Sequence, residues 1–112
     1  MESEELVDHP VLRVIAPDER IRARARAGDT EIVVTDRRLA VGSTDRLTLD
    51  IGIDGLRRIQ FDIERDRPAT LVVVPEQPSH EPQVLAVHPE DYPAVAEALV
   101  YIGQRLAGGR DG

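Results

Sequence analysis

The sequence predicts a mainly β domain: an antiparallel, barrel-like rolled sheet of six or seven strands, capped by one C-terminal α-helix. Two patterns lead to this prediction. Between residues 20 and 87, short apolar runs alternate with polar residues at a period of two, which is typical of strands with one buried face. After the last run the apolar residues change to helical spacing, at Tyr92, Val95, Leu99, Ile102 and Leu106.

The composition sets the size and nature of the core. The 112 residues are enough for one hydrophobic core and too few for two, so we expect a single domain. Hydrophobic residues make up 41% of the chain but aromatic residues only 3%, so the core must be built from aliphatic side chains. The chain has no cysteine, which excludes disulfides, thiolate metal sites and a cysteine nucleophile.

The chain is acidic, with a formal net charge of −7, and all fourteen of its basic residues are arginine. A GC-rich genome and a high-salt cytoplasm would both explain the lack of lysine. The acidity argues against nucleic-acid binding, which draws most of its free energy from phosphate neutralisation. The first residues are acidic where a secretory signal would be basic, and the longest apolar runs are far shorter than the ~20 residues of a membrane span. We therefore expect a cytoplasmic protein.

The first half of the chain predicts two strands and one irregularity. Residues 20–27 alternate strictly, Gly28-Asp29 supplies a hairpin turn, and residues 31–35 return as the second strand. The apolar positions then change from even (Ile32) to odd (Leu39), so a bulge or sharp bend is needed around residues 36–38. The proline-bounded segment at 9–17 is either a half-turn or an edge strand, and we expect it to cover one open end of the sheet.

The second half predicts the remaining elements. Residues 47–53 form the most regular strand, Asp54-Gly55 turns it, and Ile59, Phe61 and Ile63 alternate along the next strand. Residues 70–74 are expected to be buried on both faces, and residues 75–82 form a proline-rich turn before the last strand at 84–87. The helix should begin near Pro89 with Asp91 as its N-cap, and should end at Gly108-Gly109.

Three short segments resemble motifs of the bacterial pleckstrin-homology-like (PH-like) domains. They are Thr-Asp-Arg-Arg-Leu at residues 35–39, Asp-Ile-Gly-Ile at 50–53 and Leu-Arg-Arg-Ile at 56–59. In that family the first motif marks the second strand, and the other two mark the third and fourth strands. The resemblance covers roughly residues 18–107.

The resemblance implies a seven-stranded bent sheet whose open end is capped by the helix, and it implies no enzymatic activity. It places a single PH-like domain at residues 11–107, between a flexible acidic lead-in at 1–10 and a flexible tail at 108–112. The phosphoinositide chemistry of eukaryotic relatives depends on a basic loop between the first two strands. Here that loop, residues 27–30, is short and carries Asp29, which argues against phosphoinositide binding.

The first strand carries the most distinctive candidate site, a row of four arginines. Same-face neighbours on a strand lie ~6.5–7 Å apart, within the ~8 Å screening length, so these charges repel unless acids or a bound anion intervene. One interpretation is a surface for an anionic partner; the other is a solvated face paired with acids such as Glu31. Attraction to an anionic membrane is worth about 1 kcal/mol per basic residue, which is too weak for membrane association. The arginine row consists of Arg20, Arg22, Arg24 and Arg26.

Other polar residues predict structure more than chemistry. One arginine each of Arg37-Arg38 and Arg57-Arg58 is expected to point into the barrel end and pair with Asp36, Asp50 or Asp54. The three histidines lie in separate loops without metal-type spacing, so no metal or cofactor site is predicted. No nucleophile-elbow or phosphate-binding glycine pattern is present, so no catalytic residue is assigned.

Three functions remain open at this point. The first is a non-enzymatic domain for protein association, including homo-oligomers formed through exposed Val100 and Tyr101 or through strand edges. The second is an anion- or lipid-head-group-binding module that uses the arginine row. The third is a small enzyme, which a concave pocket with converging polar residues would favour.

Overall fold

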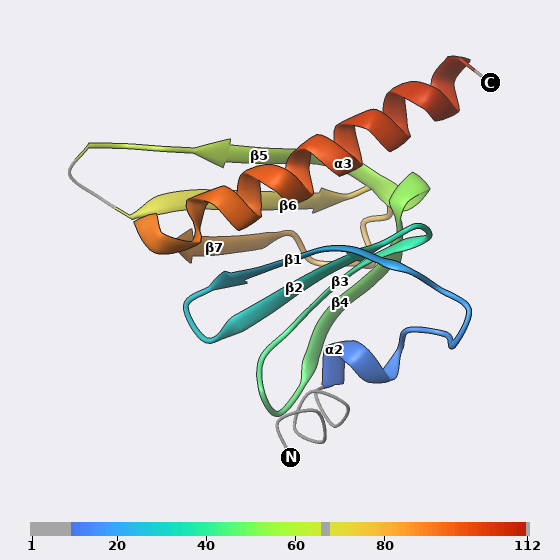
Figure 1. Cartoon of the computed structure of the whole chain (residues 1–112), viewed down its shortest axis with the longest axis horizontal. Helices are drawn as coiled ribbons and strands as arrows, with labels where there is room; N and C mark the ends of the chain where they lie inside the picture. Colours follow the sequence, from blue (N-terminus) through green and yellow to red (C-terminus); the bar gives the residue numbers. More distant parts are fainter. Residues whose placement is uncertain (1–9, 66–67, 112) are drawn as a thin grey trace.

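The computed structural model describes residues 10–65 and 68–111 (Figure 1). The expected lead-in up to His9 and part of the loop at 66–67 lie outside these residues. The described elements, in chain order, are α2 (Pro10–Arg13), β1 (Ile21–Ala27), β2 (Thr30–Thr35), β3 (Arg38–Gly42), β4 (Leu47–Gly52), the 3-10 turn η1 (Ile53–Gly55), β5 (Leu56–Asp62), β6 (Ala69–Pro75), β7 (Gln83–Val87), the 3-10 turn η2 (Pro89–Asp91) and α3 (Tyr92–Asp111).

The strands form two antiparallel sheets with a helix at the C-terminal end, so the predicted mainly β class is confirmed. The first sheet has the order β1-β2-β3-β4 and the second β5-β6-β7. The expected barrel-like roll is not closed, because β4 passes into β5 through η1 without pairing with it, and the two sheets stay separate (Figure 1). In the described residues β1, β4, β5 and β7 are therefore edge strands.

The first two turns are both sharp, and the second one explains why the apolar positions change from even to odd residue numbers. Gly28 has φ +66, the left-handed conformation that the β1–β2 hairpin turn requires. Residues 30–42 are two strands joined at Asp36-Arg37, with Ile32 opposite Val41 and Val34 opposite Leu39. The irregularity at 36–38 is thus a sharp turn between two strands and not a bulge within one.

The segment before β1 differs from both expectations. Pro10–Arg13 is a single helical turn, and it covers the outer face of the first sheet instead of an open end. Val11 is buried there against Val33 and Ala40, which makes a second, smaller core. Leu47 joins this outer core because a register shift near Gly42 turns it away from the side of Leu49.

The main core lies between the two sheets and α3. Val95, Ala98 and Ile102 of α3 are buried, and Tyr92 stacks edge-on against Phe61 of β5 with ring centroids 5.5 Å apart. Tyr101 is half-buried against this core, so the expected exposed pair is reduced to Val100, which is 58% exposed. The helix continues through Gly108-Gly109 to Asp111, so its predicted end is wrong.

Two predictions for the second sheet are also corrected. Ala69, Leu71 and Val73 of β6 face the core, but Thr70, Val72 and Val74 on the other face are only half-buried. No second layer formed by the described residues covers that face, so β6 is fully buried on one face only. Ile63 lies beyond the end of β5 and is exposed, because the strand ends at Asp62.

The contact between α2 and the first sheet depends on the absence of a side chain at Gly42. A Cβ there would lie 2.8 Å from the Arg46 carbonyl oxygen and 2.8 Å from Cγ2 of Val11. Gly42→Ala should therefore lower the free energy of unfolding by about 1–3 kcal/mol in urea denaturation. Gly52→Ala is the matched control: its Cβ would lie 3.7 Å from the nearest atom, and its effect should stay within about 0.5 kcal/mol. Equal effects of the two substitutions would contradict this packing.

Candidate functional site: the groove between β4 and β7

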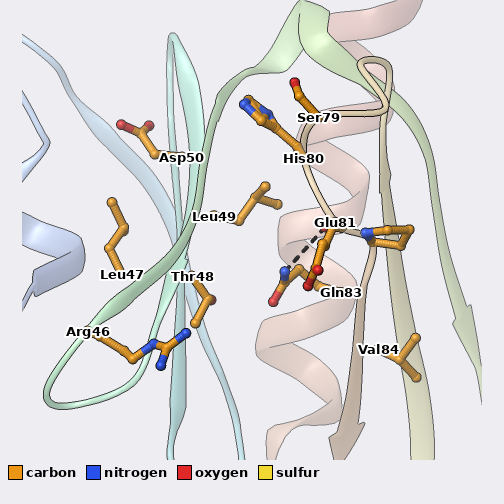
Figure 2. A pocket seen from close by; sticks show the side chains of 11 residues that line it. Arg46, Leu47, Thr48, Leu49, Asp50, Ser79, His80, Glu81, Gln83 and Val84 are labelled. Carbon is orange, nitrogen blue, oxygen red and sulfur yellow. Dashed lines mark hydrogen bonds between the residues drawn. The ribbon is translucent and has the colours of Figure 1, made fainter.

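Helix α3 covers one place where the two sheets diverge, and a groove lies where they diverge on the other side. Helix α3 packs against β1 and against Ile59 and Phe61 of β5, the edge strands of the two sheets on that side. On the other side β4 faces the end of the β6–β7 loop and the start of β7 across an open groove, while β7 also contacts β1. Figure 2 looks into this groove, with β4 on one side, the loop before β7 on the other and α3 behind.

The groove has a volume of about 670 Å³, within the usual range for binding sites. One wall is β4 with the residue before it, and the other is the end of the β6–β7 loop with the start of β7. A second recess of about 380 Å³ continues from it past η1 and shares Asp50 and His80 with it. The residues that line the β4–β7 groove are Arg46, Leu47, Thr48, Leu49, Asp50, Ser79, His80, Glu81, Pro82, Gln83 and Val84.

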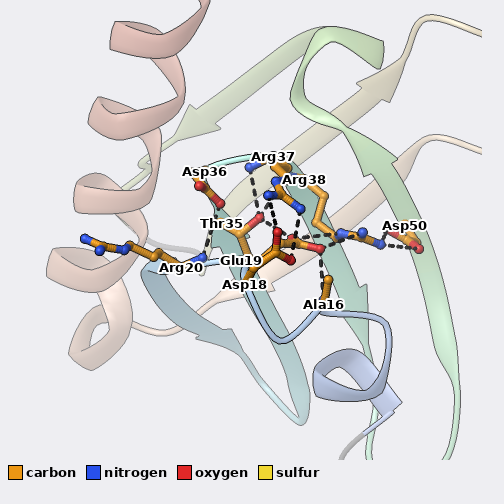
Figure 3. A network of polar contacts seen from close by, with 9 residues as sticks. All are labelled: Ala16, Asp18, Glu19, Arg20, Thr35, Asp36, Arg37, Arg38 and Asp50. Carbon is orange, nitrogen blue, oxygen red and sulfur yellow. Dashed lines mark hydrogen bonds and ion pairs between the residues drawn. The ribbon is translucent and has the colours of Figure 1, made fainter.

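The first wall is fixed by an ion-pair network that includes Asp50 (Figure 3). Arg38 donates to both carboxylate oxygens of Asp50 at 3.2 and 3.3 Å, and on its other side it pairs with Glu19 at 2.6 Å. The Glu19 side chain is 0% exposed. Arg38 thus joins β4 to the segment before β1, and the Asp50 carboxylate is neutralised where it borders the groove.

Thr35 connects this network to the β2–β3 turn. Its hydroxyl donates to Glu19 at 2.7 Å and accepts from the amides of Arg37 and Arg38 at 3.0 Å. Arg37, which is exposed, forms its own pair with Asp18 at 2.7 Å. The turn is therefore held by the side chains of Asp18 and Glu19 from the segment before β1.

Glu19 remains ionised in this buried position because its partners outweigh desolvation. Burial raises the pKa of its carboxyl group, but hydrogen bonds from the Ala16 amide, the Thr35 hydroxyl and Arg38, together with the charge of Arg38, lower it below the ordinary value of 4.5. The exposed Arg37 guanidinium likewise lowers the pKa of Asp18.

The remaining charges along the groove are mostly negative. Glu81 lines the groove itself, and Asp54 and Glu76 line the adjoining recess. None of these three carboxylates forms an ion pair within residues 10–65 and 68–111, whereas the only unpaired guanidinium among the described lining residues is that of Arg46. The groove and its extension therefore present net negative charge.

The arginine row lies elsewhere, on the outer face of β1, and is only partly neutralised. Arg24 and Arg26 share Glu31, which lies 3.5 and 3.6 Å from them. The Arg20 backbone amide donates to Asp36, but neither the Arg20 nor the Arg22 side chain forms an ion pair in the described part of the chain. The structure thus splits the row into a paired half and an unpaired half.

The two arginine pairs differ. The expected pairing with a partly buried acid is confirmed for Arg38 and Asp50, although Glu19 as the closer partner was missed. It is wrong for Arg57 and Arg58, which are both exposed because a register shift between Leu56 and Arg58 turns them outward together. No cluster of three or more His, Cys, Asp or Glu side chains suited to a metal ion occurs among the described residues.

The groove contains a serine, a histidine and carboxylate side chains, which are groups that nucleophilic catalysis uses. Nucleophilic catalysis requires the nucleophile, base and orienting group to be joined by hydrogen bonds. Ser79 and His80 are exposed, and neither side chain makes a hydrogen bond within the described residues, while Asp50 is held by Arg38. Ser79, His80 and Asp50 are therefore not joined by hydrogen bonds within the described residues.

Sequence reasoning missed the loop wall of this site. The sequence places residues 79–82 only in a proline-rich turn, since nothing in their order shows that they face β4 across a gap. The usable signal was the lack of charge in residues 83–87 next to an exposed loop, which marks an unprotected edge.

Comparison of the chain with known proteins found no matching protein family, curated protein or solved structure. The described helices include none with the length and apolar character needed to cross a membrane.

The Glu19–Arg38 pair predicts a pH-dependent stability. Because folding lowers the pKa of Glu19, its contribution is present above pH 4.5 and is lost as the pH falls through the lower, folded-state pKa. Glu19→Gln should reduce the free energy of unfolding by about 2 kcal/mol at pH 7. In urea denaturation at decreasing pH, this difference from the parent protein should shrink below pH 4.5.

Asp18→Asn is the control, because the exposed Asp18–Arg37 pair should contribute little to stability. A Glu19→Gln deficit that stays constant from pH 7 to acid would show that the carboxylate charge is not what the network stabilises.

Proposed function

We propose that this chain is a non-enzymatic, cytoplasmic PH-like domain that binds another protein through the β4–β7 groove. The single observation that carries the proposal is the uncovered opening between the sheets: a groove of about 670 Å³ whose walls are two edge strands and an exposed polar loop. Such a site offers backbone groups and side chains to a partner segment without an assembled catalytic group.

The arrangement of four strands, three strands and a terminal helix supports the PH-like interpretation. The motif segments also have structural roles in this arrangement. Residues 35–39 span the end of β2, the turn and the start of β3, and residues 50–53 cross from β4 into η1, so both lie at different places from the strands that the resemblance implied. Arg38 and Asp50 join these two segments directly.

The arginine row supports a second candidate function, an anion-binding surface. Arg22 is exposed on β1, and neither its guanidinium nor that of Arg20 has an acidic partner in the described residues. The groove is the stronger candidate because Glu31 already occupies the other two arginines, which leaves two charges on a molecule of net charge −7.

Photo-crosslinking in the source cells distinguishes these surfaces. A photoreactive residue replaces Arg46 on one wall of the groove, Ser79 on the other, or Arg22 in the row, with Val100 on α3 as the control. We expect Arg46 and Ser79 to yield crosslinks to the same protein, identified by mass spectrometry, and Arg22 and Val100 to yield none.

Crosslinks at Arg22 alone would move the function to the arginine row. If the captured protein is a second copy of this chain, light scattering should show an oligomer, and the partner would be the chain itself. Absence of any protein at both groove positions would refute the proposed function.

A further inference from the structure

We propose that the partner segment is an extended, basic stretch of protein that adds to the free edge of β7 as a further strand. This inference rests on the proposed function and specifies the occupant of the groove. It derives from three independent features: how each sheet edge is protected, where the β7 edge lies, and the charge around it.

Exposed strand edges are normally blocked by charges, bulges or cover, since they otherwise pair with other chains. The β1 edge has a register shift between Ile21 and Ala23, outward arginines and the cover of α3. The β5 edge has a register shift between Leu56 and Arg58 and the exposed pair Arg57-Arg58. Both edges are therefore unsuited to strand addition.

The β4 and β7 edges, which face the groove, are not equivalent. β4 carries Asp50 and follows a register shift at Val41 and Gly42. β7, with the sequence Gln-Val-Leu-Ala-Val, has no charged residue, and it pairs with β6 without a register shift from Gln83 to Val87. Among the described edge strands, β7 is the one without a charge or a register shift.

The position of β7 determines where an added strand could pair with it and how long that strand could be. Gln83 and Val84 line the groove, and Val84 is 68% exposed, the most exposed large hydrophobic residue in the described chain. Pro82 and Pro89 flank the strand, and proline lacks the amide that would extend the ladder. Because β7 also contacts β1, an added segment would pair mainly where β7 lines the groove, at Gln83 and Val84, and over no more than the five-residue length of β7.

The charge of the site selects a basic occupant. Glu81 lies beside the start of β7, and Asp54 and Glu76 line the continuation of the groove, all without ion pairs in the described residues. Arg46 on the β4 wall is the unpaired cation of the lining, so the described groove and its continuation keep a net negative charge. A second copy of this chain would bring another net charge of −7 to the same place. A segment that alternates basic and apolar residues would satisfy the carboxylates and pack on the Val84 face at once.

A direct test uses a synthetic peptide of alternating arginine and valine, about seven residues long and blocked at both ends. Its affinity for the full chain is measured by fluorescence anisotropy and compared with that of the same peptide with glutamate in place of arginine. We expect the arginine peptide to bind at least about tenfold more tightly at physiological salt.

Two lysine substitutions distinguish peptide binding at the β7 edge from non-specific electrostatic attraction to an acidic protein. Val84→Lys adds an edge charge at the site, and Val100→Lys adds the same charge at a similarly exposed position on α3. We expect Val84→Lys to weaken binding by about tenfold or more and Val100→Lys by less than about twofold, with both melting temperatures little changed. Equal weakening by the two variants would overturn the proposal.

Backbone methylation tests strand addition itself. Two versions of the arginine peptide are N-methylated at alternate residues, one at the odd and one at the even positions. Because an added strand offers only every second amide to its neighbour, one version should lose about tenfold or more in affinity while the other binds nearly as well as the parent.

The outcomes separate this inference from the proposed function. If both methylated peptides bind like the parent while Val84→Lys still weakens binding, the groove binds side chains and strand addition is wrong, but the proposed function stands. If the glutamate peptide binds equally well, the assignment of a basic partner is wrong. A dimer seen by light scattering and dissociated by Val84→Lys would replace the basic segment by a second copy of the chain.

Discussion

The arrangement depends on one constraint: the two sheets diverge, and the described residues include one helix long enough to cover an opening between them. Helix α3 closes the opening beside β1 and β5 by burying Val95, Ala98 and Ile102. The sequence contains one phenylalanine, two tyrosines and no tryptophan, and all three aromatic side chains pack on the α3 side of the core. No aromatic side chain lines the described β4–β7 opening, which therefore remains a groove.

The two walls of that groove differ in structure. The β4 wall is fixed, because Asp50 is tied through Arg38 to the buried carboxylate of Glu19 and hence to the β2–β3 turn. Removing one member of such a partly buried network leaves another charge without its partner, so each member helps to hold β4 to the segment before β1. The β7 wall is a regular edge without charges. A fixed wall opposite an unprotected edge is a suitable geometry for holding an extended segment.

The sequence predicted those features that follow from local pattern. Alternation at Ala23, Ala25 and Ala27 correctly predicted a strand with one buried face, and the helical stripe correctly placed Val95 and Ile102 in the core. The turn at Gly28 followed from the need for a positive φ. Each of these elements is determined by residues close together in the sequence, so the local sequence was sufficient to predict it.

The errors concern contacts between distant segments. Val11 packs on the outer face of β2 and β3, and Glu19 reaches Arg38, but neither contact leaves a periodic signal in the sequence. The groove was missed for the same reason, because it arises from the relative placement of two sheets that only tertiary packing decides. A further error is local: the helix passes through Gly108-Gly109 although paired glycines usually end helices.

The central claim is that the β7 edge is open in the free protein, and amide hydrogen exchange followed by NMR tests it most directly. Every amide of a central strand such as β6 can pair with a neighbour, whereas in an open edge strand every second amide faces solvent. We therefore expect protection along β6 but alternating slow and fast exchange where β7 lines the groove, beginning at Gln83 and Val84. Uniform protection along β7 would show that its edge is already covered in solution and would contradict the account.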